Sequence, residues 1–114
     1  MNSYPMILMD FLDYLETIKG RSSNTVKEYA YDINLMIKYI LARKQNIKLK
    51  SFDDIVKIDS SDVDLNFFKN IDVIDLHSFM GFLDHNRSNG SSTRSRKTSS
   101  IRTFYKYLIN IRKL

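Results

Sequence analysis

The sequence predicts an all-α domain, a bundle of four main helices with short connecting helices between them. Apolar residues recur at intervals of three and four along most of the chain, which is the period of an amphipathic helix. Only three glycines and one proline interrupt this pattern, and no segment alternates apolar and polar residues strongly enough to predict a sheet. The 114 residues suffice for one hydrophobic core, so we expect residues 1–114 to form a single domain.

The first predicted helix covers residues 5 to about 19. Pro5 suits the first turn of a helix, because its missing N–H would have no partner there, and Gly20 supplies a stop. The inward stripe of this helix is expected to consist of Ile7, Leu8, Phe11, Leu12, Leu15 and Ile18.

The second predicted helix covers residues 23 to about 44. Its start stays open between a capping box formed by Thr25 with Glu28 and a simpler cap at Ser22 or Ser23. The inward stripe of this helix is expected to consist of Val26, Tyr29, Ile33, Met36, Ile37 and Ile40.

The remaining chain alternates connections with two further main helices. Residues 45–71 are irregular, with one short helical turn expected within 51–55 and another within 64–68. Asp72 is expected to cap a third main helix ending near His85, with Ile74, Phe79, Phe82 and Leu83 turned inward. After a polar loop at 87–92, the last helix begins near Ser92 or Thr93 and buries Ile101, Phe104, Tyr105 and Leu108.

The charge of the chain is unevenly distributed. Its net charge is +5, but residues 1–50 carry +3, residues 51–86 carry −6, and residues 87–114 carry +8 with no acidic side chain. Such a basic segment is typical of a surface that binds a polyanion, although a solvated tail can have the same composition.

Two helix surfaces carry side chains suited to nucleic acid. The outward face of the last helix is expected to hold Arg96, Ser99, Thr103 and Lys106, with Arg102 beside them and Arg94 and Lys97 at the N-terminal end. Long cations reach phosphates or guanine edges, and short hydroxyls permit close approach. The start of the second helix adds a polar cluster at residues 21–25, followed by Lys27, Glu28 and Tyr31. Either surface alone would also suit a solvent-exposed helix.

Nothing in the sequence predicts catalytic or metal chemistry. His77 and His85 lack a third ligand at metal spacing, and the carboxylates of residues 53–75 match neither an acid–base pair nor a calcium loop. Tyr107 has no set of His, Arg and Lys around it that would activate it as a nucleophile. We therefore expect no cofactor, no metal and no small-molecule ligand. Without cysteine or an apolar run of about 18–20 residues, we expect a cytoplasmic protein that does not enter a membrane.

Three motifs resemble those of a known family. Residues 23–33 (SNTVKEYAYDI) are similar to the signature S-x-N-T-x-x-x-Y-x-x-D-L, and residues 93–108 (TRSRKTSSIRTFYKYL) to T-x-x-R-K-L-S-A-L-R-S-F-Y-x-Y-L. Residues 11–15 (FLDYL) match F-L-x-Y-L. Together they resemble the N-terminal core-binding domain of phage-type integrases and Xer-like tyrosine recombinases. The last helix departs from the pattern at Thr98 and Ser100, where the family usually has Leu and Ala, so looser packing is expected there.

The resemblance implies a SAM-like helical bundle that forms half of a clamp around double-stranded DNA at the recombination core site, with two helices in the major groove. Matching those helices to this chain implicates Asn24, Thr25, Lys27 and Tyr31 on one, and Arg94, Arg96, Lys97, Ser99 and Arg102 on the other. The family's catalytic tyrosine belongs to a C-terminal domain that this chain lacks, so we expect no catalysis by this fragment. The expected parent is a tyrosine recombinase whose other protomers are partners during synapsis.

Two other functions remain open from the residues alone. A helical protein-interaction module would use exposed Phe, Met and Leu side chains to bind another protomer. A helix-turn-helix regulator fits less well, because the turn between the first two helices and the long acidic connection do not match that motif.

Overall fold

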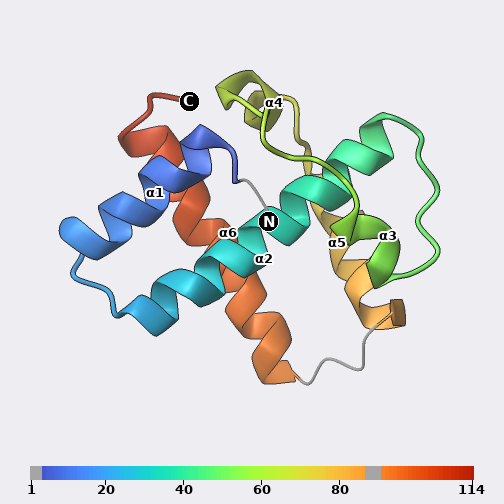
Figure 1. Cartoon of the computed structure of the whole chain (residues 1–114), viewed down its shortest axis with the longest axis horizontal. Helices are drawn as coiled ribbons and strands as arrows, with labels where there is room; N and C mark the ends of the chain where they lie inside the picture. Colours follow the sequence, from blue (N-terminus) through green and yellow to red (C-terminus); the bar gives the residue numbers. More distant parts are fainter. Residues whose placement is uncertain (1–3, 87–90) are drawn as a thin grey trace.

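The computed structural model describes residues 4–86 and 91–114, without the side chains of Phe52, Asn86 and residues 91–94. Over these ranges the chain forms six helices and no strand (Figure 1). Their bounds are α1 Met6–Thr17, α2 Ser23–Lys44, α3 Phe52–Val56, α4 Leu65–Lys69, α5 Val73–Asn86 and α6 Ser91–Asn110. The predicted all-α bundle of four main helices with two short ones is confirmed. The predicted polar loop falls largely on residues 87–90, outside the described residues.

Helix α2 is the central element of the bundle. It runs through the middle of the molecule and packs against α1, α3, α5 and α6 (Figure 1). Residues 30–42 are buried except for Tyr31, Tyr39 and Leu41, so this helix is covered nearly all round over that stretch. A helix with this burial pattern fixes the positions of its neighbours relative to one another.

The helix ends follow from local side-chain chemistry. The Ser22 side chain accepts a hydrogen bond from the backbone N–H of Thr25 at 3.3 Å, which resolves the start of α2 in favour of a simple serine cap. Asp64 caps α4 in the same way through the N–H of Phe67 at 3.2 Å. Beyond α1, Gly20 adopts a φ of +62°, and the N–H of Arg21 then donates to the carbonyl of Leu15 at 2.9 Å. The left-handed residue turns the chain from α1 into α2.

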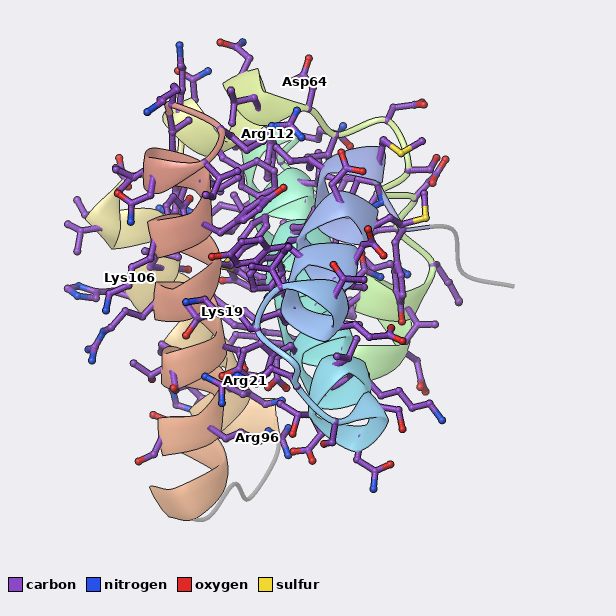
Figure 2. The ribbon with its side chains drawn as sticks, turned by 90° about the vertical axis from the view of Figure 1, so that its left-hand side faces the viewer. Lys19, Arg21, Asp64, Arg96, Lys106 and Arg112 are labelled. Atoms are coloured by element: carbon purple, nitrogen blue, oxygen red, sulfur yellow. The ribbon has the colours of Figure 1, made fainter. Side chains whose placement is uncertain are left out.

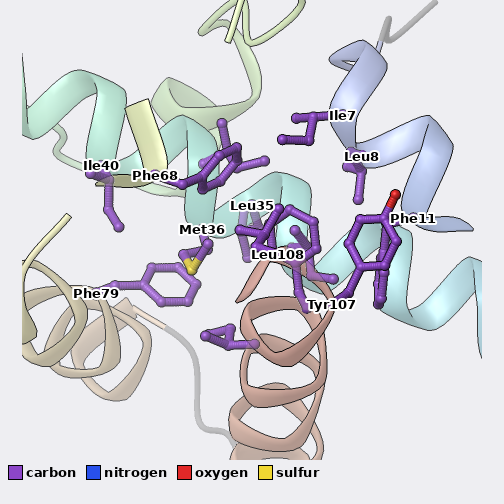
Figure 3. Close-up of a cluster of buried hydrophobic side chains, with 14 of the residues drawn as sticks. Ile7, Leu8, Phe11, Leu35, Met36, Ile40, Phe68, Phe79, Tyr107 and Leu108 are labelled. Carbon is purple, nitrogen blue, oxygen red and sulfur yellow. The ribbon is translucent and has the colours of Figure 1, made fainter. Parts of the chain in front are cut away.

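The core is an aromatic and aliphatic cluster to which all six helices contribute (Figure 3). Phe104 lies at its centre, with its ring centroid 5.0 Å from that of Phe11 and 5.1 Å from that of Phe68. Both contacts are edge-on, the arrangement that aromatic quadrupoles favour. The short helix α4 is thereby held against the main core.

Two residues expected in the core are instead on the surface. Ile18 is 70% exposed and Ile74 is 62% exposed. Ile18 follows the last residue of α1, where the chain already turns away. Ile74 precedes Asp75, the first-turn residue of α5 that is buried against α2, and so lies on another side of the helix. In the described part of the chain, no helix combines the length and hydropathy needed to cross a membrane.

Candidate nucleic-acid interface

The N-terminal half of α2 is joined to α6 through Asp32, a fully buried carboxylate. Three side chains of α6 converge on it. Arg96 donates through Nε to Oδ2 at 3.1 Å and through Nη2 to Oδ1 at 2.9 Å. Lys97 donates to Oδ1 at 2.8 Å, and the Ser100 hydroxyl donates to Oδ2 at 3.0 Å. We call this group the Asp32 cluster.

The Asp32 cluster is electrostatically satisfied. Burying a carboxylate is costly unless it is paired and hydrogen-bonded, and two cations and a hydroxyl meet that requirement here. The hydrogen bond to Asp32 raises the pKa of Arg96 above its usual value, with a further contribution from the nearby carboxylate of Glu28. Glu28 lies 3.3 Å from Nη1 of Arg96. The cluster fixes the position of α6 on α2.

At Ser100, one of the two departures from the family pattern, the expectation of looser packing is wrong. Its side chain is fully buried, and its hydroxyl donates to Asp32. The serine therefore adds a hydrogen bond to the helix contact in place of the methyl group of an alanine. Thr98 is exposed on the same helix.

The predicted DNA-contacting residues divide into two groups. Most are accessible: Asn24, Lys27, Tyr31, Ser99 and Arg102 are exposed, and Thr25 and Arg96 are partly exposed. Lys97 differs, because it is only 1% exposed and its ammonium group is committed to Asp32, with the ring of Tyr31 centred 5.1 Å away. The side chain of Arg94 lies outside the described residues.

Sequence reasoning missed Asp32 and Ser100 as parts of this surface's support. A signal for the buried pair of Asp32 with Lys97 was present. Asp32 falls next to Ile33 on the inward side of α2, and Lys97 precedes Ile101 by one turn, on the same stripe as Phe104. A carboxylate and a cation that each fall on an apolar stripe indicate a buried pair, which the predicted DNA-binding surface did not take into account.

A second ion-pair cluster joins the other end of α2 to α5. Arg43 donates through Nε to Oδ1 of Asp75 at 2.9 Å, and Nζ of Lys44 lies 3.4 Å from Oδ2. Asp72 and Asp75 also cap the start of α5 reciprocally, each side chain accepting from the other's backbone N–H at 2.9 and 3.1 Å. Burial acts to raise the pKa of Asp75, but the hydrogen bonds from Asp72, Arg43 and Lys44 outweigh it and lower that pKa.

No group of three or more His, Asp or Glu side chains in the described ranges could hold a metal ion. Among the tyrosines, burial raises the pKa of Tyr105 to about 12, with a further contribution from the charge of Asp75. That shift makes the phenol less easily ionised. Tyr107 is buried between α1 and α6, with its ring centroid 5.0 Å from that of Tyr14. The environments of both side chains fit a packing role.

Comparison with known proteins gives the family. The family described as "Phage integrase, N-terminal SAM-like domain" matches residues 8–58. The chain is also 42% identical, over 107 residues and 92% of its length, to a protein named tyrosine recombinase XerC from Caldanaerobacter subterraneus subsp. tengcongensis. This chain is an N-terminal domain of the tyrosine recombinase family. Two further proteins of that name, from two serovars of Leptospira interrogans, are each 27% identical over 99 residues and 87% of the chain.

The tyrosine recombinase domain described here spans a minor part of those relatives. It covers 29% of the length of the Caldanaerobacter protein and 25% of each Leptospira protein. No solved structure matches the chain. The family match and the helical structure together confirm the resemblance inferred from the three sequence motifs.

Proposed function

We propose that this domain binds duplex DNA at the core site of a tyrosine recombinase, through the N-terminal parts of α2 and α6. The observation that carries the proposal is the Asp32 cluster, because it locks together the two helices whose exposed side chains are polar or cationic. Two helices held rigidly to one another can enter a groove as a unit, without the entropy cost of ordering them on binding.

The exposed residues suggest how the contact is divided. Arg102 and Lys27 carry charges suited to phosphates, and Asn24, Thr25 and Ser99 are short enough for the backbone or base edges to approach closely. Arg96 keeps 38% of its side chain exposed beside Glu28, so it remains a candidate contact. For Lys97 we propose a supporting role, in which it holds α6 through Asp32 and does not touch DNA.

The activity of the whole protein is part of the same proposal. The name of the relatives, tyrosine recombinase, suggests that a parent protein breaks and rejoins DNA strands and that other protomers are its partners. We place the catalytic groups outside this domain, because Tyr107 is buried and both ion-pair clusters serve helix packing. A role on chromosomal or mobile DNA would locate the protein in the cytoplasm.

The test is fluorescence anisotropy with a labelled duplex of mixed sequence, titrated with this chain at several salt concentrations. If about five phosphates are neutralised, the slope of log K against log salt should be about −4 to −5. Arg102→Ala should weaken binding several-fold. Lys69→Ala is the matched control, because Lys69 is an exposed cation on α4 and its loss changes the net charge equally. Absence of binding at low salt would reject the proposal of DNA binding. Equal effects of the two variants would reject the assignment of the contact to α2 and α6.

A second candidate function is association with another copy of the recombinase through α5. Val73 and Ile74 are both more than 60% exposed, and Val73 lines a largely apolar hollow of about 200 Å³ together with Leu76, Met80 and Ile101. Sedimentation of this chain without DNA tests the idea. Concentration-dependent self-association that Ile74→Ser abolishes would support it, and a monomer at all concentrations would reject it.

A further inference from the structure

A cleft of about 280 Å³ lies between the end of α1 and the second half of α6. Its floor includes Leu15 and Tyr107, both nearly buried. Its rim carries Lys19 and Arg21, from the connection between α1 and α2, and Lys106 from α6. Figure 2 looks onto this side of the molecule, where the labelled Lys19 and Arg21 lie beside α6. No acidic residue lines the cleft.

The three cations at the rim of the cleft differ in their pairing from most cations at the contacts between helices. Arg43, Arg96, Lys97 and Arg112 each have a carboxylate within hydrogen-bond distance. In the described part of the chain, no carboxylate pairs with any of the three rim cations, and all three are exposed. Three like charges around one concavity repel one another, and its low-dielectric walls focus a positive potential into it.

The backbone that carries Lys19 and Arg21 is held in place. Its left-handed residue, Gly20, has a φ of +62°, and the N–H of Arg21 donates to the carbonyl of Leu15 at 2.9 Å. The N–H of Lys19 donates to the carbonyl of Tyr14 at 3.2 Å. Both anchoring residues also line the cleft. The two cations therefore start from fixed positions relative to its floor, which limits the entropy lost when they bind a common anion.

We propose that this cleft seats a backbone phosphate of the duplex, next to the surface formed by α2 and α6. Arg21 immediately precedes Ser22, the cap of α2, so the cleft adjoins the N-terminal end of that helix. Lys106 lies one turn beyond Arg102 on α6. Thr103, which also lines the cleft, adds a hydroxyl that can donate to a phosphate oxygen. The proposal rests on DNA binding by this domain. It adds Lys19 to the expected helix surfaces and joins it with Arg21, Thr103 and Lys106 in one phosphate site.

The experiment compares two triple variants that remove the same charge. The cleft variant carries Lys19→Gln, Arg21→Gln and Lys106→Gln. The control carries Lys48→Gln, Lys57→Gln and Lys69→Gln, which are exposed cations that do not line the cleft. Anisotropy with the labelled duplex gives the salt slope of each protein, and thermal unfolding verifies that both variants remain folded.

The cleft variant should bind several-fold more weakly than the control, with a salt slope reduced in magnitude by about 0.9 for the one phosphate lost. The control should keep the slope of the unaltered chain. Equal salt slopes and equal affinities for the two variants would overturn the proposal that the cleft binds a phosphate, while leaving the proposal of DNA binding intact. Failure of the unaltered chain to bind would instead overturn the proposed function, and this site with it.

Discussion

The two halves of α2 are held by ion pairs of the same chemistry in opposite arrangement. In the N-terminal half, the carboxylate of Asp32 is on α2 and its cations are on α6. Near the C-terminal end, the cations Arg43 and Lys44 are on α2 and the carboxylate of Asp75 is on α5. Burial separates the two clusters. The side chains of Asp32 and Lys97 are 0% and 2% exposed, whereas those of Arg43 and Lys44 are 40% and 36% exposed.

This difference shows that the distances within an ion pair do not determine its importance. The Lys97–Asp32 and Arg43–Asp75 distances are 2.8 and 2.9 Å. When a buried partner is removed, the remaining charge stays in a medium that cannot solvate it. When a half-exposed partner is removed, water replaces it. The end of α2 that we propose to bind DNA is therefore the more sensitive to substitution.

Removal of the Asp32 carboxylate should have the largest effect on stability. In Asp32→Ala, Lys97 would remain buried without its acceptor, and the free energy of unfolding should fall by about 3–5 kcal/mol. Urea unfolding at neutral pH measures the change. Asp13→Ala is the control, since it removes one carboxylate from the exposed side of α1 and should alter stability by less than about 0.5 kcal/mol. Similar losses of unfolding free energy in the two variants would contradict the idea that burial makes Asp32 important.

Asp75→Ala should have an intermediate effect. It removes a helix cap worth about 1 kcal/mol and a charge-assisted hydrogen bond from Arg43 of similar size, for a total of about 2 kcal/mol. The same urea measurement applies, with Asp75→Asn as a comparison that keeps the shape of the side chain. A loss of unfolding free energy as large as that in Asp32→Ala would show that exposure does not determine how much each ion-pair cluster contributes to stability.

Acid should weaken the Asp75 cluster in a defined direction. Because the folded state lowers the pKa of Asp75, its contribution to stability is complete above the ordinary carboxyl pKa of about 4 and is lost as the pH falls through the lower folded value. The stability difference between the unaltered chain and Asp75→Asn should hold from pH 7 to about pH 5 and shrink below about pH 4. A difference that grew on acidification would contradict the direction of the pKa shift.

The smallest effect is expected for the surface pair of Arg112 with Asp10. Their 3.0 Å contact resembles the others in length, but the side chains are 36% and 45% exposed. Asp10→Asn should lower the free energy of unfolding by about 0.5 kcal/mol or less. A loss above about 1 kcal/mol in urea unfolding would mean that this pair connects the end of the chain to α1 more strongly than its exposure implies.

The sequence was sufficient for the fold because helix limits depend on nearby residues. Serine caps, Gly20 and the spacing of apolar residues placed α2 at the bounds observed, Ser23–Lys44. The same local signals could not reveal that Ile18 and Ile74 are exposed. Burial near a helix end depends on which side of it a neighbouring helix covers, and that information lies elsewhere in the chain.

The candidate site was predictable only in part, for a related reason. Exposed residues such as Lys27 and Arg102 could be located from helix periodicity alone. The burial of Lys97 depends on Asp32, which lies 65 residues earlier in the chain. A charged side chain on an apolar stripe signals that a partner exists without identifying it.

The separation between Asp32 and its partners also bears on how the domain is made. The three side chains that satisfy Asp32 follow it by 64, 65 and 68 residues. At about 5–20 residues per second, a ribosome would take roughly 3 to 13 seconds to add the first of them. Until α6 has been synthesised, burying Asp32 would leave its carboxylate without a partner, which is unfavourable. Because α6 supplies both these partners and the core residues Phe104 and Leu108, the fold can be completed only once the last helix is present.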